Sequence, residues 1–170
     1  MGREVRMVPK NWEHPKDERG NFRPMFDRDY KQEFNEWLEE KEKWDAGFQK
    51  DWSTDGYKPK YEKYKDTSFE EWSGTAPDSR YYMPNWPKEE RTHLMMYEDT
   101  SEGTPISPAF ETPEELAKWL ADNKASSFGS DTATYEQWLN MITGSGYAPS
   151  MVIENGVMKS GVEFISDNSH

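Results

Sequence analysis

The sequence predicts a single α+β domain over residues 1–170, in which three to four amphipathic helices cover a small, mainly antiparallel sheet. Apolar stripes behind cap signals predict the helices, and an Asn-Gly pair between two runs of strand formers predicts a hairpin. Aromatic residues replace aliphatic ones, because 8 Trp, 9 Tyr and 8 Phe accompany a hydrophobic fraction of only 33%. Since large rings bury much surface, we expect a compact, aromatic core with long, aromatic-pinned loops.

The first part of the chain predicts one strand and one long helix. Residues 3–9 alternate Val5 and Met7 with charged neighbours and stop at a proline, which is typical of a short edge strand. Residues 11–26 are interrupted by proline and glycine without any period, so we expect an irregular loop. In residues 27–52, apolar side chains recur at helical spacing behind two aspartates that can cap a helix. This segment is expected to be the longest helix.

Residues 51–90 are the least regular part. Tyrosines and lysines interleave between prolines in residues 55–66. This pattern is typical of proteins that stack single-stranded bases and contact phosphates. It equally describes aromatic staples that fix a loop onto the core, with lysine stems lying over the rings. Ser68 and Glu71 form a capping box that predicts a short helix.

A strand, a stiff connector and a helix are expected next. Residues 92–98 carry apolar side chains on both faces, which favours a central strand. Residues 103–110 contain two prolines that fix the backbone without donating hydrogen bonds, so this connector is preset either to present a surface or to pack on the core. Thr112 and Glu115 form a capping box, with a proline between them, for a helix that ends near Asn123.

The last part of the chain predicts a helix and a hairpin. Residues 135–142 carry an apolar stripe that a glycine terminates. Residues 150–163 contain Asn155-Gly156, which suits a type I′ turn. We expect this hairpin to join the strand at 92–98 in one sheet, and the last five residues to fray.

Tryptophan recurs four times at the third position after an aromatic residue or leucine. The four residues are Trp37, Trp72, Trp119 and Trp138. Tryptophan at this helical spacing is usually a core residue, whereas several exposed indoles can also form a cage for a cation. The pattern is compatible with both interpretations.

No catalytic or cofactor-binding motif occurs in the sequence. The phosphate-binding, dinucleotide-binding, zinc-protease and nucleophile-elbow patterns are missing, and His14, His93 and His170 are scattered. Cysteine is absent, which excludes disulfides and thiolate metal sites. We therefore expect no catalytic residue, no metal and no cofactor. No leader or apolar run of membrane-spanning length is visible, which predicts a soluble, intracellular protein.

The net charge of −12 is concentrated toward the carboxyl terminus. Residues 1–91 carry a net charge of −3, whereas residues 92–170 carry −9. Within the predicted domain, a near-neutral, irregular and helical part (1–91) therefore precedes an acidic strand-helix-helix-hairpin part (92–165). An acidic surface repels phosphate backbones and favours a basic protein surface as partner, although acids can also serve solubility alone. The residues expected to contact such a partner are Asp99, Glu102, Glu111, Glu114, Glu115 and Asp122.

Three segments resemble a family of proteins of about this size encoded by tailed bacteriophages and prophages. They are REVRMVPKNWEHPKDERGNFRPMFD, SEGTPISPAFETPEELAKWLADN and FGSDTATYEQWL. The resemblance extends over most of the chain and implies expression in a bacterial host cytoplasm during infection. It carries over no catalytic residue, cofactor or substrate. Small acidic phage proteins include anti-restriction and anti-CRISPR inhibitors that occupy nucleic-acid sites on host defence enzymes, which is an analogy by class.

Three functions are compatible with these observations. The favoured hypothesis is a non-enzymatic binding protein, of the defence-inhibitor type, whose acidic part docks on a basic, nucleic-acid-binding host surface. The first alternative is a small enzyme or ligand-binding protein with an aromatic pocket. The second is a single-stranded nucleic-acid binder that uses residues 55–66. The oligomeric state is left open.

Overall fold

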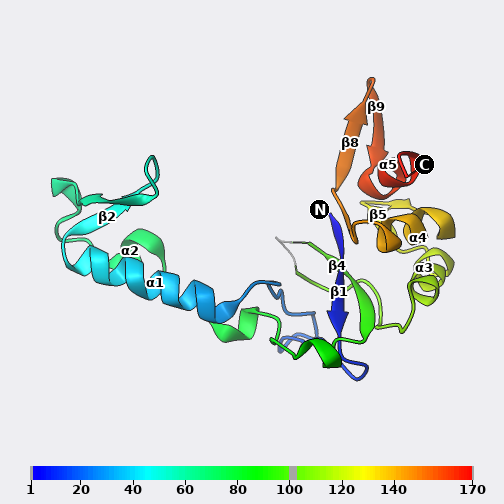
Figure 1. The fold of residues 1–170 in the computed structure, drawn as a ribbon, viewed down its shortest axis with the longest axis horizontal. Helices are drawn as coiled ribbons and strands as arrows, with labels where there is room; N and C mark the ends of the chain where they lie inside the picture. The colour runs from blue at the N-terminus through cyan, green and yellow to red at the C-terminus, as the bar shows by residue number, and fades with distance from the viewer. Residues whose placement is uncertain (1, 100–102, 170) are drawn as a thin grey trace. The chain divides into compact units, whose positions relative to one another are not determined.

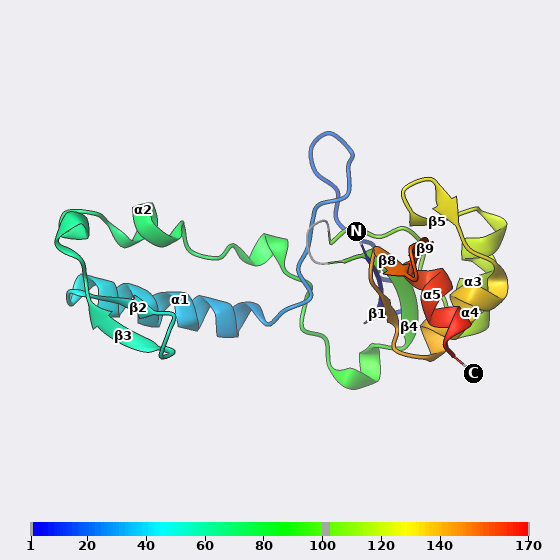
Figure 2. The same ribbon diagram turned by 90° about the horizontal axis from the view of Figure 1, so that it is seen from above.

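The computed structural model describes residues 2–99 and 103–169, which form two compact units. Unit 1 comprises Met1–Asp27 and Met83–His170, and unit 2 comprises Arg28–Tyr82. Figure 1 and Figure 2 show the helices and small antiparallel sheets within each unit. The α+β class is confirmed. The boundaries between the units fall at residues 27/28 and 82/83. The single-domain assignment stays a prediction.

A three-stranded antiparallel sheet forms the centre of unit 1. Strand β1 (Arg3–Val8) pairs along its whole length with β4 (His93–Glu98), and its first two residues pair with β7 (Tyr147–Ala148). The prediction of an edge strand at 3–9 was wrong, because β1 is the central strand. Pro9 follows the strand and therefore removes no hydrogen bond from its ladder.

The proline-containing connector lies along the other edge of β4. Leu94 and Phe110 exchange two backbone hydrogen bonds, and the Ile106 amide donates to the Met96 carbonyl. The Ser107 hydroxyl accepts a hydrogen bond from the Met96 amide at 2.9 Å. The connector therefore satisfies backbone groups that the three-stranded order would leave at an edge. These contacts show that the connector packs on the core, which is the second of the two roles predicted for it.

Three helices lie together on one side of β1 and β4 (Figure 1, Figure 2). They are α3 (Pro113–Asp122), α4 (Tyr135–Thr143) and α5 (Gly161–Asp167). The predicted capping box of α3 is present, and α4 has one as well. The helices bury a core against the sheet, whose largest fully buried side chains are Met96, Leu116, Leu120, Trp138, Met141 and Val162. Between α3 and α4, β5 (Ser126–Phe128) and β6 (Asp131–Thr132) form a small hairpin.

The carboxyl-terminal hairpin forms with the predicted turn. Strands β8 (Met151–Glu154) and β9 (Val157–Ser160) pair across Asn155 and Gly156, which have φ values of 50° and 78°. The hairpin is a separate two-stranded sheet, so the prediction that it joins the 92–98 strand was wrong. The chain also leaves strand conformation at Ser160, because its hydroxyl accepts from the Glu163 amide and caps α5.

Unit 2 begins with α1 (Tyr30–Asp45), which Asp29 caps. The helix is shorter than predicted, because Gly47, at φ 96°, turns the chain into a hairpin of β2 (Phe48–Asp51) and β3 (Gly56–Pro59). A short 3-10 turn and α2 (Phe69–Ser73) follow, and the predicted capping box of α2 is confirmed. Residues 28–82 contain 13 aromatic residues and no Val, Ile or Met. The interior of unit 2 is therefore built from rings.

Candidate functional site

The structure separates the predicted partner-contacting acids. Asp99 is only 7% exposed, and its Oδ1 accepts a hydrogen bond from the Gly2 amide at 3.0 Å. Its assignment to a partner-contacting surface is therefore corrected: its carboxylate holds the start of β1 rather than facing solvent. Glu102 lies outside the described residues.

The remaining four acids are exposed and lie on or beside α3. Glu111 precedes the helix, and Glu114 and Glu115 lie in its first turn. Asp122 lies at the opposite end and pairs with Lys118. Glu114 and Asp122 are separated by eight residues, or about 12 Å along a helix axis. Of these four carboxylates, Glu115 is engaged in the capping box and Asp122 in the ion pair. Glu111 and Glu114 are therefore the better candidates for contact with a partner.

Positively charged residues are scarce in residues 103–169 of unit 1. Residues 103–169 contain nine acidic residues and three lysines, Lys118, Lys124 and Lys159. Two of these lysines form ion pairs within this part, Lys118 with Asp122 and Lys159 with Asp167. The surface therefore keeps a surplus of negative charge after its own ion pairs are formed.

A buried polar network lies around Tyr97, in the second core of unit 1, which is separate from the core under α3 and α4. The ring of His14 contacts the Tyr97 hydroxyl through Nδ1 at 3.0 Å and the Arg23 carbonyl through Nε2 at 2.6 Å. The Trp12 indole also donates to the Tyr97 hydroxyl, at 3.1 Å. Because the Arg23 carbonyl can only accept, Nε2 carries the ring hydrogen and Nδ1 accepts from the Tyr97 hydroxyl, whose pKa burial raises to about 12. Both nitrogens of His14 are thus engaged in structure.

An open depression of about 1050 Å³ borders this network. Lys10, Lys16, Trp12 and Phe22 line it together with His14. Since the His14 nitrogens bond to Tyr97 and to the backbone, the depression has no free imidazole nitrogen for acid–base chemistry. His93, the other histidine considered in the sequence, contacts the Thr92 hydroxyl through Nδ1 at 2.8 Å.

We expect unit 1 to lose stability on acidification because of His14. Burial holds the pKa of His14 below its usual value of 6.5, so the folded protein binds fewer protons than the unfolded chain. This contribution to the free energy of unfolding is complete above about pH 6.5 and falls as the pH drops toward the folded pKa. Urea unfolding at pH 7.5 and at pH 5.5 should show the loss. A His14→Gln variant should show a smaller loss, whereas equal losses would contradict the assignment.

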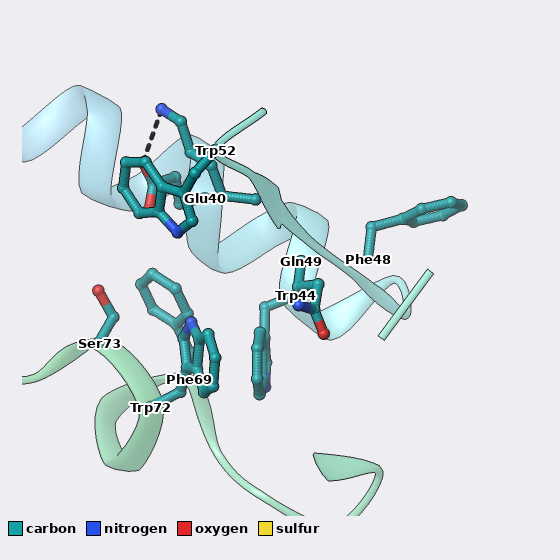
Figure 3. Close-up of a pocket in the computed structure, with 9 residues that line it drawn as sticks. Glu40, Trp44, Phe48, Gln49, Trp52, Phe69, Trp72 and Ser73 are labelled. Atoms are coloured by element: carbon teal, nitrogen blue, oxygen red, sulfur yellow. Dashed lines mark hydrogen bonds and ion pairs between the residues drawn. The ribbon is translucent and has the colours of Figure 1, made fainter. Parts of the chain in front are cut away.

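A small aromatic pocket of about 220 Å³ lies in unit 2 (Figure 3). We call it the indole pocket. Its lining residues are Glu40, Trp44, Phe48, Gln49, Lys50, Trp52, Phe69, Trp72 and Ser73. The Trp52 ring lies across the opening from the Trp44, Phe69 and Trp72 rings, whereas Phe48 points away from them (Figure 3).

Three segments position the indoles. Trp44 lies in the last turn of α1 and donates its Nε1 hydrogen to the Thr67 carbonyl at 2.8 Å. Trp72 lies on α2 and stacks on Trp44 with ring centroids 5.0 Å apart. Trp52 follows β2 and is 79% exposed. Two of the indoles are therefore fixed by packing, and the third is presented to solvent.

Cations already lie against these rings. The Lys50 ammonium is 3.1 Å from the Glu40 carboxylate and 5.5 Å from the centroid of the Trp52 ring. The hydrogen bond to Glu40 raises the pKa of Lys50, which remains fully charged at neutral pH. The Lys60 ammonium lies 4.5 Å from the centroid of Trp44. The electron-rich faces of the indoles thus attract positive charge in this structure.

The interleaved tyrosines and lysines of residues 55–66 pack on one another. Lys58 lies over the ring of Tyr61, and Lys63 lies over the rings of Tyr61 and Tyr64. Tyr64 in turn lies 4.6 Å from Trp72, measured between ring centroids. These contacts fit the staple interpretation, because lysine ammonium groups already lie over the ring faces that a nucleobase would use.

Within residues 2–99 and 103–169, no group of three or more His, Asp or Glu side chains is arranged to hold a metal ion. Among the helices described, none has the length and apolar character needed to cross a membrane. Comparisons with protein-family models, curated proteins and solved structures found no match for this chain.

Sequence reasoning considered the indole pocket only as a general possibility. The spacing identified Trp72 as a helical residue but placed Trp52 at the end of a long helix, where it would not face Trp44. The Gly47 turn brings β2 back along α1 and creates the opening. The signals for this hairpin in the sequence were Gly47 and the turn before Gly56.

Proposed function

We propose that this chain is a non-enzymatic binding protein that docks on a basic surface of a partner protein in the cytoplasm of a bacterial host. The surplus of exposed carboxylates in residues 103–169 supports this proposal, because two of the three lysines there are held by internal ion pairs. A surface of this sign steers and orients a basic partner. In the phage setting that the resemblance implies, a host defence enzyme with a nucleic-acid-binding surface is the matching class of partner.

The test is salt-dependent capture by the full chain. The immobilised protein is incubated with bacterial lysate at about 50 mM and at about 500 mM salt, since exposed charges are screened at the higher value. A basic protein should be retained at low salt and released at high salt. It is then identified by mass spectrometry and purified, so that its Kd for the chain can be measured.

Neutralising Glu111 and Glu114 should weaken this binding. We expect the Glu111→Gln/Glu114→Gln variant to lose up to about fivefold in affinity for each carboxylate, as exposed ion pairs typically contribute. A matched variant in unit 2, Glu42→Gln/Asp66→Asn, removes the same charge from exposed positions elsewhere. Equal losses in the two variants, or binding that is insensitive to salt, would contradict docking through this surface.

A further inference from the structure

We propose that the indole pocket of unit 2 is a recognition site for one arginine side chain of a partner protein. The site combines the rings of Trp52 and Trp72, the latter backed by the buried Trp44, with the carboxylate of Glu40. It lies in a different unit from the acidic surface around α3. The inference rests on the proposed function for its class of partner, a basic protein, but it is carried by a separate set of residues.

The chemistry of the lining selects a cation. Indole faces are the best aromatic partners for a positive charge, and a desolvated contact is stronger than an exposed one. Glu40 supplies a carboxylate at the same pocket, with its side chain only 24% exposed. A guanidinium matches this combination, because its planar face stacks on rings and its edge donates two parallel hydrogen bonds to a carboxylate.

The size of the pocket limits the ligand to a single group. Its volume of about 220 Å³ lies below the roughly 300–1,000 Å³ of pockets that hold whole cofactors or drug-sized molecules. Trp44 and Trp72 are stacked directly on each other at 5.0 Å, so no ring can enter between them. The opening below Trp52 therefore suits a flat, narrow end group on a flexible stem.

Lys50 occupies the position of the incoming cation. Its ammonium contacts Glu40 and lies near the Trp52 ring, which are the two interactions that a guanidinium would make. Its side chain is 27% exposed, and its release breaks the ion pair with Glu40, which a bound guanidinium would replace. Asp55 also interacts electrostatically with Lys50 and can receive the displaced ammonium. Lys50 thus acts as an internal competitor that an arginine must replace.

The experiment titrates the full chain with N-acetyl-arginine amide. Binding is followed by the indole N–H signals of the tryptophans in two-dimensional ¹H–¹⁵N NMR spectra. We expect saturable shifts for Trp52 and Trp72, and none with the neutral citrulline analogue, which has the same shape without the charge. Equal shifts with both compounds, or no saturation with either, would overturn the proposal.

Three variants test the assignment of residues. Trp52→Ala removes an exposed ring and should weaken binding about fivefold without unfolding unit 2. Lys50→Met removes the competitor and should strengthen binding about threefold. Lys58→Met serves as the matched control, because Lys58 lies on the same hairpin but contacts Asp51 and Tyr61 outside the pocket. Weaker binding in Lys50→Met would contradict its role as a competitor.

The outcomes separate this inference from the proposed function. If the arginine probe fails while Glu111→Gln/Glu114→Gln still lowers affinity for the captured partner, only the pocket assignment is wrong. If the probe binds but no basic protein is captured by the chain, the pocket stands and docking through the acidic surface is wrong.

Discussion

Replacing Trp44 with alanine is expected to unfold unit 2. Trp44 is 2% exposed and contacts Phe69 and Trp72, and its indole nitrogen donates to the Thr67 carbonyl. Removing a buried tryptophan costs about 3–5 kcal/mol in the free energy of unfolding. No Val, Ile or Met occurs in residues 28–82 to fill the space. A unit of this size has a marginal core, so this loss is comparable to its whole stability.

The change is measured by near-ultraviolet circular dichroism and by limited proteolysis. Cleavage should appear within residues 28–82 while the fragments of unit 1 stay resistant. Trp52→Ala is the matched control, because it removes an indole of the same pocket that is 79% exposed. A Trp44→Ala protein as resistant as the control would show that the ring core of unit 2 does not depend on this residue.

Replacing Arg6 with methionine is expected to destabilise unit 1 by about 3 kcal/mol, at the lower end of the cost of breaking a buried ion pair. Arg6 is 3% exposed, and its Nη1 donates to the Met25 carbonyl at 2.8 Å. Its Nε and Nη2 both donate to Glu4, and the guanidinium lies 4.4 Å from the centroid of the Tyr97 ring. Methionine preserves the bulk of the side chain but leaves the Glu4 carboxylate and the Met25 carbonyl without these donors.

Chemical denaturation followed by backbone amide signals of β1 and β4 measures this effect. The Glu4→Gln/Arg6→Met double variant should recover part of the loss, because it removes the part-buried carboxylate along with its partner. Arg19→Met provides a control at an exposed position in the same amino-terminal segment. If Arg6→Met were no more harmful than this control, the buried guanidinium would not be holding β1 to the loop at Met25.

The short-range signals of the sequence predicted many of the local structures. The capping boxes at Ser68 and Thr112 start α2 and α3, and the Asn155-Gly156 pair forms its turn. These features succeed because the groups that satisfy one another lie within four residues, so their hydrogen bonds form in almost any tertiary setting.

The long-range features were missed for the opposite reason. Asp99 was predicted as a surface acid, but its partner is the amide of Gly2, 97 residues away. The helical pattern in residues 27–52 continued past the end of α1, because the ring of Phe48 fits a helix stripe as well as a strand. Local sequence gives no sign of the Asp99 contact, whereas Gly47 and Gly56 were the local signals against a continuous helix.

The sequence by itself determined the α+β class, the starts of the capped helices, the carboxyl-terminal turn and the surplus of negative charge. Only the tertiary structure decided that β1 is central, that the proline connector covers the edge of β4, and that Trp44, Trp52 and Trp72 share one pocket with Glu40. Capping and turn energies depend on neighbours in the chain, whereas burial and ring contacts depend on which distant segments meet in space.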